Sequence, residues 1–190
     1  MRTGPRSEAD QYAHFGCGMT LYAELLGEDL ARLPAPLRAI HARLGTATYR
    51  GDVEVRGATA LFARLCARVA DLPSAYRGPI EVEIVAADGA EQWTRRFGAH
   101  VMRSRLRAHD GYLYERLGPV RFTFALAADD AAIHWRVARL SVCGLPLPAS
   151  WFAGVCAVES ADGDRYRFDV RAALPGVGTI VHYRGSLDVL

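Results

Sequence analysis

Apolar and polar residues alternate along almost the whole second half of the chain, from residue 79 to the C-terminus. In the stretch IEVEIVA, Ile80, Val82 and Ile84 fall on one face, and Glu81 and Glu83 fall on the other. A period of two is typical of a half-buried strand. Short turn signals such as Asp-Gly separate the segments and leave no room for the helical crossovers of a parallel sheet. The pattern therefore predicts an antiparallel meander.

The number of alternating segments limits the shape of this sheet. Together with TATYRGDVEVR at residues 46–56, the chain carries about nine or ten predicted strands. A single twisted sheet of that many strands tends to curl on itself. We predict the α+β class, mostly β, with a curved antiparallel barrel or half-barrel.

Helical spacing of apolar residues is confined to the region before residue 73. It occurs in three segments, at residues 20–33, 34–45 and 58–73. The stripe of the third segment consists of Leu61, Phe62, Leu65, Cys66 and Val69. We predict two or three N-terminal helices that cover an open mouth or edge of the sheet. Residues 1–20 are polar and contain glycine, so we predict a loose segment there, followed by a single domain at residues 21–190.

Composition excludes several classes of enzyme. All 23 basic residues are arginine, so no lysine can form a Schiff base, anchor pyridoxal phosphate or serve a phosphate-binding loop. No stretch approaches the ~18–20 consecutive apolar residues of a membrane span. Residues 1–16 lack the continuous apolar core of a signal peptide, so we expect a cytoplasmic protein. The formal net charge of +2 is too small to indicate a nucleic-acid partner.

Residue spacing gives no indication of a metal site or a nucleophile. The six histidines form no H-x-H or H-E-x-x-H pattern, and the chain has no G-x-S-x-G elbow. The cysteines are scattered without a C-x-x-C pair, at Cys17, Cys66, Cys143 and Cys156. We therefore predict a function that needs no metal and no other cofactor.

Four short motifs occur in order along the second half of the chain: WTRRFG, YERLGPVRF, GLPLP and VHYRGSL. Together with the helical stretch LYAELLGEDLARLPAPLRAIHARLG, they resemble a bacterial family known as domain of unknown function 4166. Members of that family occur alone, behind an NAD-binding saccharopine-dehydrogenase-like domain, or attached to membrane proteins. The resemblance implies a shared fold and a link to small-molecule metabolism. It supplies no catalytic residues, and this chain has no room for the NAD-binding domain.

The alternation also indicates which polar side chains point into the sheet. With the apolar residues of each strand on the inner face, the inward polar residues are Tyr49, Trp93, Arg95, His100, Ser104, Glu115, Tyr166 and Tyr183. A bent sheet of this size can enclose one small ligand. We predict Glu115, His100 and Tyr183 as catalytic residues. The predicted ligand contacts are Tyr49, Trp93, Arg95, Ser104 and Tyr166.

Glu115 is the least expected of these residues, because it shares its row with leucines. An unpaired carboxylate is costly in such a place. Two interpretations are open. In the first, Glu115 pairs with Arg95 or Arg121, or hydrogen-bonds Tyr183, and has a structural role. In the second, it faces a cavity as an acid, a base or a ligand anchor.

The outward arginines of residues 103–107 and 165–171 are also open to two interpretations. We favour a solvated sheet face whose charge is balanced by Glu81, Glu83 and Asp169. The alternative is a basic stripe. No nucleic-acid partner and no membrane span are predicted, and the oligomeric state is left open.

The pattern favours a protein that binds a lipophilic small molecule in a barrel cavity. Its predicted activity is that of a cofactor-independent acid/base enzyme of the cyclase, isomerase or dehydratase type. The alternative is a non-catalytic ligand-binding or accessory module of an oxidoreductase system. A cavity of ~300 Å³ or more with Glu115 on its wall favours the enzyme. A filled core with a salt-bridged Glu115 favours the module.

Overall fold

Strands make up most of the domain, as the alternation predicts. The structure is a computed structural model that describes residues 18–189. Most of the predicted loose segment at residues 1–20 therefore lies outside the described residues. The strands are β1 (Gly45–Gly57), β2 (Tyr76–Ala87), β3 (Ala90–Phe97), β4 (His100–His109), β5 (Tyr112–Leu117), β6 (Val120–Ala128), β7 (Ala132–Val142), β8 (Leu145–Leu147), β9 (Gly154–Asp162), β10 (Arg165–Leu174) and β11 (Gly178–Asp188).

The strands form one antiparallel sheet that closes on itself. Strands that follow one another in the chain are neighbours in the sheet, except that β9 pairs with β7, because the short β8 is a side branch of β7. The first and last strands, β1 and β11, pair from Arg50↔Asp188 to Gly57↔Val181 and so complete the ring. The fold is a closed ten-stranded antiparallel barrel with one extra strand, which confirms the predicted barrel and its mostly β class.

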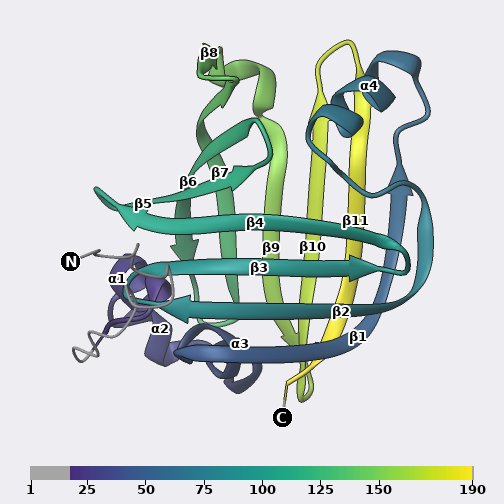
Figure 1. Ribbon diagram of the computed structural model, residues 1–190. Helices are drawn as coiled ribbons and strands as arrows, with labels where there is room; N and C mark the ends of the chain where they lie inside the picture. Colours follow the sequence, from purple (N-terminus) through teal and green to yellow (C-terminus); the bar gives the residue numbers. More distant parts are fainter. Residues whose placement is uncertain (1–17, 190) are drawn as a thin grey trace, which may run out of the picture.

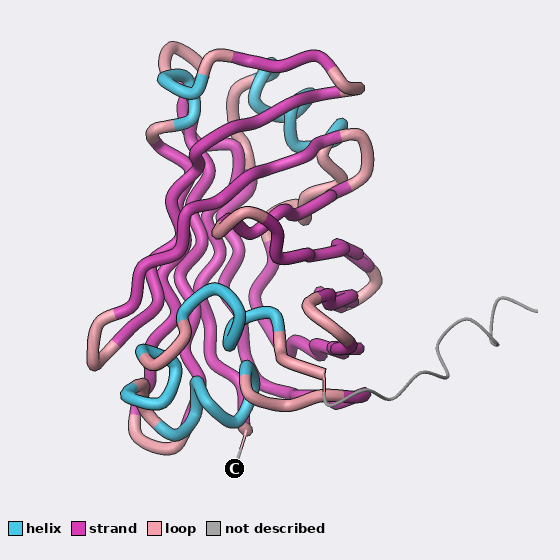
Figure 2. The backbone as a smooth tube through the Cα atoms, turned by 90° about the vertical axis from the view of Figure 1, so that its left-hand side faces the viewer, coloured by secondary structure: helices cyan, strands magenta, loops and turns pink. Residues whose placement is uncertain are grey.

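Helices lie at both ends of this barrel. The helical segments are α1 (Leu21–Leu26), α2 (Asp29–Arg32), α3 (Ala35–His41), α4 (Leu61–Val69) and the 3-10 helix η2 (Ala149–Phe152). In Figure 1, β2, β3 and β4 cross in front of β9, β10 and β11, with α1–α3 at the bottom and α4 at the top. Figure 2 shows the two groups of helices from the side. We call the two ends the α1–α3 end and the α4 end. Of the helices in the described part of the chain, none is long and apolar enough to cross a membrane.

Apolar packing closes the α1–α3 end. Thr20 begins α1, and its hydroxyl oxygen accepts a hydrogen bond from the amide of Ala23 at 3.2 Å. The side chains of Leu21, Leu33 and Leu37 are almost completely buried against the barrel. These helices therefore cover one mouth of the sheet, as predicted.

Two glycines allow β1 and β11 to approach closely. A Cβ atom at Gly51 would lie 1.8 Å from the carbonyl oxygen of Ser186, and one at Gly185 would lie 2.2 Å from that of Asp52. β1 pairs with β2 from its first residue and with β11 only from Arg50 onward. A glycine inside a strand often marks a bend or a close backbone approach. Here the glycines lie where β1 passes from one layer of the barrel to the other.

Candidate functional site

Glu115 lies on the inner face of β5, in the register that the hairpin predicts. The leucines on either side of it in this row, Leu113 and Leu117, are buried. The Glu115 carboxylate is only 13% exposed and lies 3.8 Å from the guanidinium of Arg95, measured from Oε1 to Nη1. A carboxylate in an apolar row is therefore balanced by a buried cation.

Arg95 is the centre of a polar cluster in the barrel interior. Its Nη1 donates a hydrogen bond to the Ser104 hydroxyl at 2.9 Å. Its guanidinium carbon lies 4.6 Å from the centre of the Trp93 ring. The ion pair to Glu115 and the cation–π contact together offset the cost of burying this charge. Four of the predicted site residues thus meet in space.

A small cavity lies beside this cluster. Its volume is about 30 Å³, and its polar walls come from Trp93, Arg95, Glu159, Tyr166 and Tyr183. That volume holds about one or two water molecules. The predicted site residues converge, but around a nearly filled core. Glu115 itself is not among the residues that line the cavity.

Two buried residues of this region, His41 and Glu159, were not predicted from the sequence. His41, at the end of α3, is fully buried, and its Nε2 lies 2.8 Å from Oε2 of Glu159, although the contact is not aligned as a hydrogen bond. The His41 ring also lies 3.7 Å from the ring centre of Tyr22. The Gly-Asp turn after β9 could have revealed Glu159, because it places Glu159 opposite the inward Phe168. Nothing in the sequence marks His41.

A third missed residue, Glu91, lies on the same face of β3 as Trp93 and Arg95. It accepts a hydrogen bond from the indole Nε1 of Trp93 at 2.6 Å. The period-two pattern that selected Trp93 and Arg95 could have selected Glu91 too. Despite these carboxylates, no group of three or more metal-ligating side chains within residues 18–189 could hold an ion.

Burial keeps the interior tyrosines protonated. Burial raises the pKa of Tyr183 to about 12, and the nearby Arg95 only partly opposes this effect. Burial and the Glu159 carboxylate raise the pKa of Tyr166 well above its ordinary value. At neutral pH these hydroxyls can donate a hydrogen bond but cannot act as bases.

The buried Glu91 is expected to lower stability at neutral pH. Burial, the largest effect, raises its pKa, although His41 and Trp93 favour the charged form. A carboxyl with a raised folded-state pKa binds its proton more tightly when folded, so stability falls as the pH rises from the unfolded-state pKa through the folded-state pKa. We expect Glu91→Gln to raise Tm at pH 8 by about 2–4 °C, which corresponds to ~1 kcal/mol in a domain of this size.

At pH 4 the gain should be smaller, because the native carboxyl then carries its proton. Scanning calorimetry of Glu91→Gln at both pH values measures the difference. Glu28→Gln, on an exposed residue, serves as the control. A larger gain at pH 4 than at pH 8 would contradict the expected sign.

Two predicted site residues lie apart from the cluster. Tyr49 is buried, and its hydroxyl donates a hydrogen bond to the carbonyl of Ala39 in α3 at 3.3 Å. His100 lies at the α4 end, with its Nε2 3.1 Å from the carbonyl oxygen of Asp71. These contacts fix a helix and a loop. The proposed roles of both residues in binding or catalysis stay predictions.

A much larger cavity opens at the α4 end. Its volume is about 490 Å³, which lies within the range of about 300–1,000 Å³ typical of small-molecule sites. Its walls come from α4, η2 and strands β6 to β11. Among the described residues that line it, only Cys66 and Trp151 carry a polar atom in the side chain. No carboxylate or histidine of residues 18–189 borders it.

α4 forms one wall of this cavity with an unusual orientation. Its buried residues are the small Ala63 and Ala67, which pack against Ile180 of β11. The predicted apolar stripe faces the cavity mouth instead, and Phe62 and Leu65 are 61% and 55% exposed. An apolar stripe of this kind ordinarily faces the core. Here it leaves an open apolar surface.

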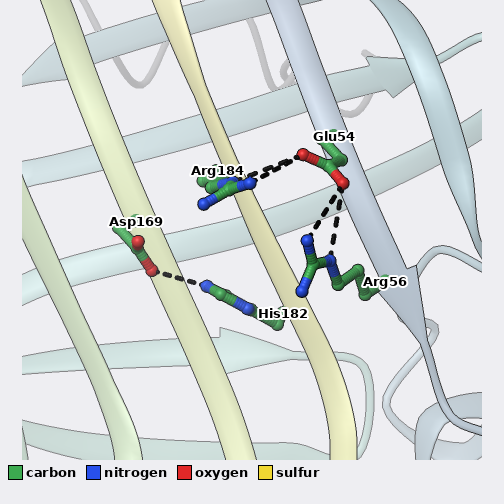
Figure 3. A network of polar contacts seen from close by, with 5 residues as sticks. All are labelled: Glu54, Arg56, Asp169, His182 and Arg184. Atoms are coloured by element: carbon green, nitrogen blue, oxygen red, sulfur yellow. Dashed lines mark hydrogen bonds and ion pairs between the residues drawn. The ribbon is translucent and has the colours of Figure 1, made fainter.

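A third depression lies on the outer surface beside β1 and β11 and is polar. Glu54 accepts hydrogen bonds from Arg184 at 3.0 and 3.4 Å and from Arg56 at 3.4 Å, and His182 contacts Asp169 at 2.9 Å (Figure 3). The hydrogen bonds from Arg184 lower the pKa of Glu54. These charges satisfy one another, which is typical of a solvated sheet face.

The outward arginines divide into two groups. Arg165 pairs with Asp188 at 2.8 Å, and Arg167 pairs with Asp162 at 3.5 Å. The arginines of residues 103–107 form no ion pair within the described part of the chain. Glu81 pairs instead with Arg50 of β1 and Arg96 of β3, and Asp169 pairs with His182. The expected balance of charge therefore does not extend to β4.

The geometry defines a class: a small closed antiparallel barrel that is filled at one end and hollow and apolar at the other. Residues 33–187 match the family described as Domain of unknown function (DUF4166), and the chain belongs to this family, which confirms the resemblance of the motifs. The crystal structure of Rv2717c from M. tuberculosis is similar with a TM-score of 0.42 and 13% sequence identity, over 83% of this chain and 99% of that one. A search of curated proteins gave no match.

Proposed function

We propose that this protein binds a lipophilic small molecule in the apolar cavity at the α4 end. The observation that carries the proposal is a cavity of about 490 Å³ with an almost entirely apolar wall. A ligand that fills it gains ~25 cal/mol for each Å² of apolar surface removed from water. Because a buried charge without a partner is costly, the cavity favours an uncharged ligand.

The same geometry favours binding over catalysis. The three residues predicted for acid/base chemistry, Glu115, His100 and Tyr183, do not line the apolar cavity. A cyclase, isomerase or dehydratase needs a group within reach that donates or accepts a proton. Among residues 18–189, the walls of this cavity supply only the Cys66 thiol and the Trp151 indole, and no carboxylate, histidine or tyrosine. The non-catalytic ligand-binding module is therefore the function that we propose.

Filling the cavity tests this proposal. Ala172 of β10 lines the cavity, whereas Ala125 of β6 is exposed on the outer surface. We expect Ala172→Trp to weaken binding of the neutral lipophilic dye Nile red by about tenfold or more, a loss of ~1.4 kcal/mol. The matched variant Ala125→Trp should bind the dye like the wild type. Fluorescence titration measures both, and circular dichroism checks the fold.

A measurement on the wild type covers the case in which Ala172→Trp does not fold. A ligand that binds only the folded state raises Tm with its concentration. We expect such a rise with the dye, and we expect native mass spectrometry of protein from its own host to show a co-purifying lipophilic molecule. Absence of the Tm rise, or equal dye binding by Ala172→Trp and the wild type, would overturn the proposal.

A further inference from the structure

We propose that the rim of the apolar cavity docks on the surface of an anionic lipid bilayer. The rim, here called the apolar rim, consists of Leu61, Phe62, Leu65, Val69, Leu145 and Trp151. This inference concerns the surface through which a ligand enters. It goes beyond ligand binding and does not require that the cavity be occupied.

The apolar rim exposes large side chains together. Leu61 is 84% exposed, Leu145 70% and Trp151 53%. They come from three elements, α4, β8 and η2, and Phe62 and Trp151 border the cavity itself. Figure 1 places α4 and β8 at the same end of the barrel. A gathering of exposed apolar side chains around a cavity is typical of an interaction surface.

Arginines surround this rim. Arg64 and Arg68 are exposed on α4, next to its apolar stripe. On the outer surface Arg116 and Arg121 are cross-strand neighbours, and Arg139 lies on the adjoining strand β7. Val120, Phe122 and Leu140 alternate with these arginines and face the cavity. Within residues 18–189 none of the five arginines takes part in an ion pair, so their charge is available to a partner.

Acidic residues gather at the opposite end of the barrel. The strand connections there carry the exposed Asp88, Asp110, Asp129, Asp130 and Asp164. The described connections at the α4 end carry a single acidic residue, Asp71. An anionic surface therefore attracts the α4 end and repels the α1–α3 end. This charge asymmetry turns the mouth of the cavity toward such a surface.

An anionic bilayer satisfies both features at once. Leucine, phenylalanine and tryptophan side chains insert at the boundary between headgroups and acyl chains, while arginines contact the lipid phosphates. A nucleic acid would engage the arginines but would leave the apolar rim in water. A lipophilic molecule dissolved in the bilayer could then enter the cavity without crossing water.

Vesicle flotation with the intact protein tests the inference. We expect binding to vesicles of phosphatidylcholine and phosphatidylglycerol, and at least about tenfold weaker binding to phosphatidylcholine alone. The emission of Trp151 should shift to the blue on binding. The other two tryptophans, Trp93 and Trp135, are 4% and 5% exposed and report little of this change.

Variants separate docking from ligand binding. Leu61 and Leu145 are exposed and do not line the cavity. We expect Leu61→Gln/Leu145→Gln to weaken vesicle binding by about tenfold or more and to bind Nile red like the wild type. Met19→Gln/Leu44→Gln, on exposed residues at the other end, is the matched control and should float like the wild type.

The arginine contribution is tested by Arg64→Gln/Arg68→Gln, which should reduce the preference for phosphatidylglycerol, with Arg43→Gln as its control. Three results would overturn the inference. The first is wild-type protein that does not float with phosphatidylglycerol vesicles. The second is undiminished binding by Leu61→Gln/Leu145→Gln. The third is that the protein binds an RNA oligonucleotide at a salt concentration at which it does not bind phosphatidylglycerol vesicles.

Discussion

Replacing Arg95 by methionine should cost the protein about 3–5 kcal/mol of stability, a fall in Tm of about 6–20 °C for a domain of this size. The guanidinium lies 3.8 Å from the Glu115 carboxylate and also attracts Glu91. Methionine retains much of the packing against Trp93 but leaves the Glu115 carboxylate without its cation and removes the attraction of Arg95 for Glu91. Urea unfolding followed by tryptophan fluorescence measures the loss.

Two further variants identify the cause. Arg103→Met removes an exposed arginine from the outer face of β4 and should change stability by less than ~0.5 kcal/mol. Arg95→Met/Glu115→Gln should recover part of the loss, because it removes the charge that Arg95→Met leaves unpaired. Recovery would support the structural interpretation of Glu115. Equal losses for Arg95→Met and Arg103→Met would contradict it.

Gly185→Ala should cost at least ~3 kcal/mol, the range of a severe steric change. The added Cβ atom would lie 2.2 Å from the carbonyl oxygen of Asp52 and 3.0 Å from the Cα atom of Val53. Both are backbone atoms, so β1 and β11 must separate at the pairing that completes the ring.

Gly144→Ala distinguishes this clash from ordinary backbone strain. Gly144 has a φ of 84° and no atom within 4 Å of an added Cβ. Its substitution should therefore cost only the ~1–2 kcal/mol of a left-handed backbone. Urea denaturation compares the two variants. Similar losses for both would mean that the strands can adjust to the methyl group at Gly185.

Glu115 was predicted as a catalytic residue, but its buried ion pair with Arg95 favours a role in stability. The alternation placed Glu115 and Arg95 on the inner face, and the structure brings them together. The alternation did not indicate how much space remains beside Arg95. Side chains from β2, β3, β9, β10 and β11 leave a cavity of only about 30 Å³ there.

The sequence by itself determined the strands, their antiparallel order and the face on which each side chain lies. These features are local. A period of two assigns a face, and an Asp-Gly pair such as Asp88–Gly89, with φ of 39° and 68°, adopts the tight turn that the pattern predicts. The same period of two also predicts that Glu91 points inward, because it lies on the same face of β3 as Trp93.

Only the tertiary structure decided where the barrel is hollow. The closing pair joins Arg50 to Asp188, and no local pattern specifies contacts over that separation. The apolar stripe of α4 predicts a face that packs into the core. The helix instead packs against β11 with its opposite side, because Ala63 and Ala67 are small enough to allow this contact. The physical reason is that cavity volume depends on the summed sizes of side chains from many distant strands. Alternation predicts the face of the sheet on which each side chain lies, but it does not predict which residues that side chain contacts.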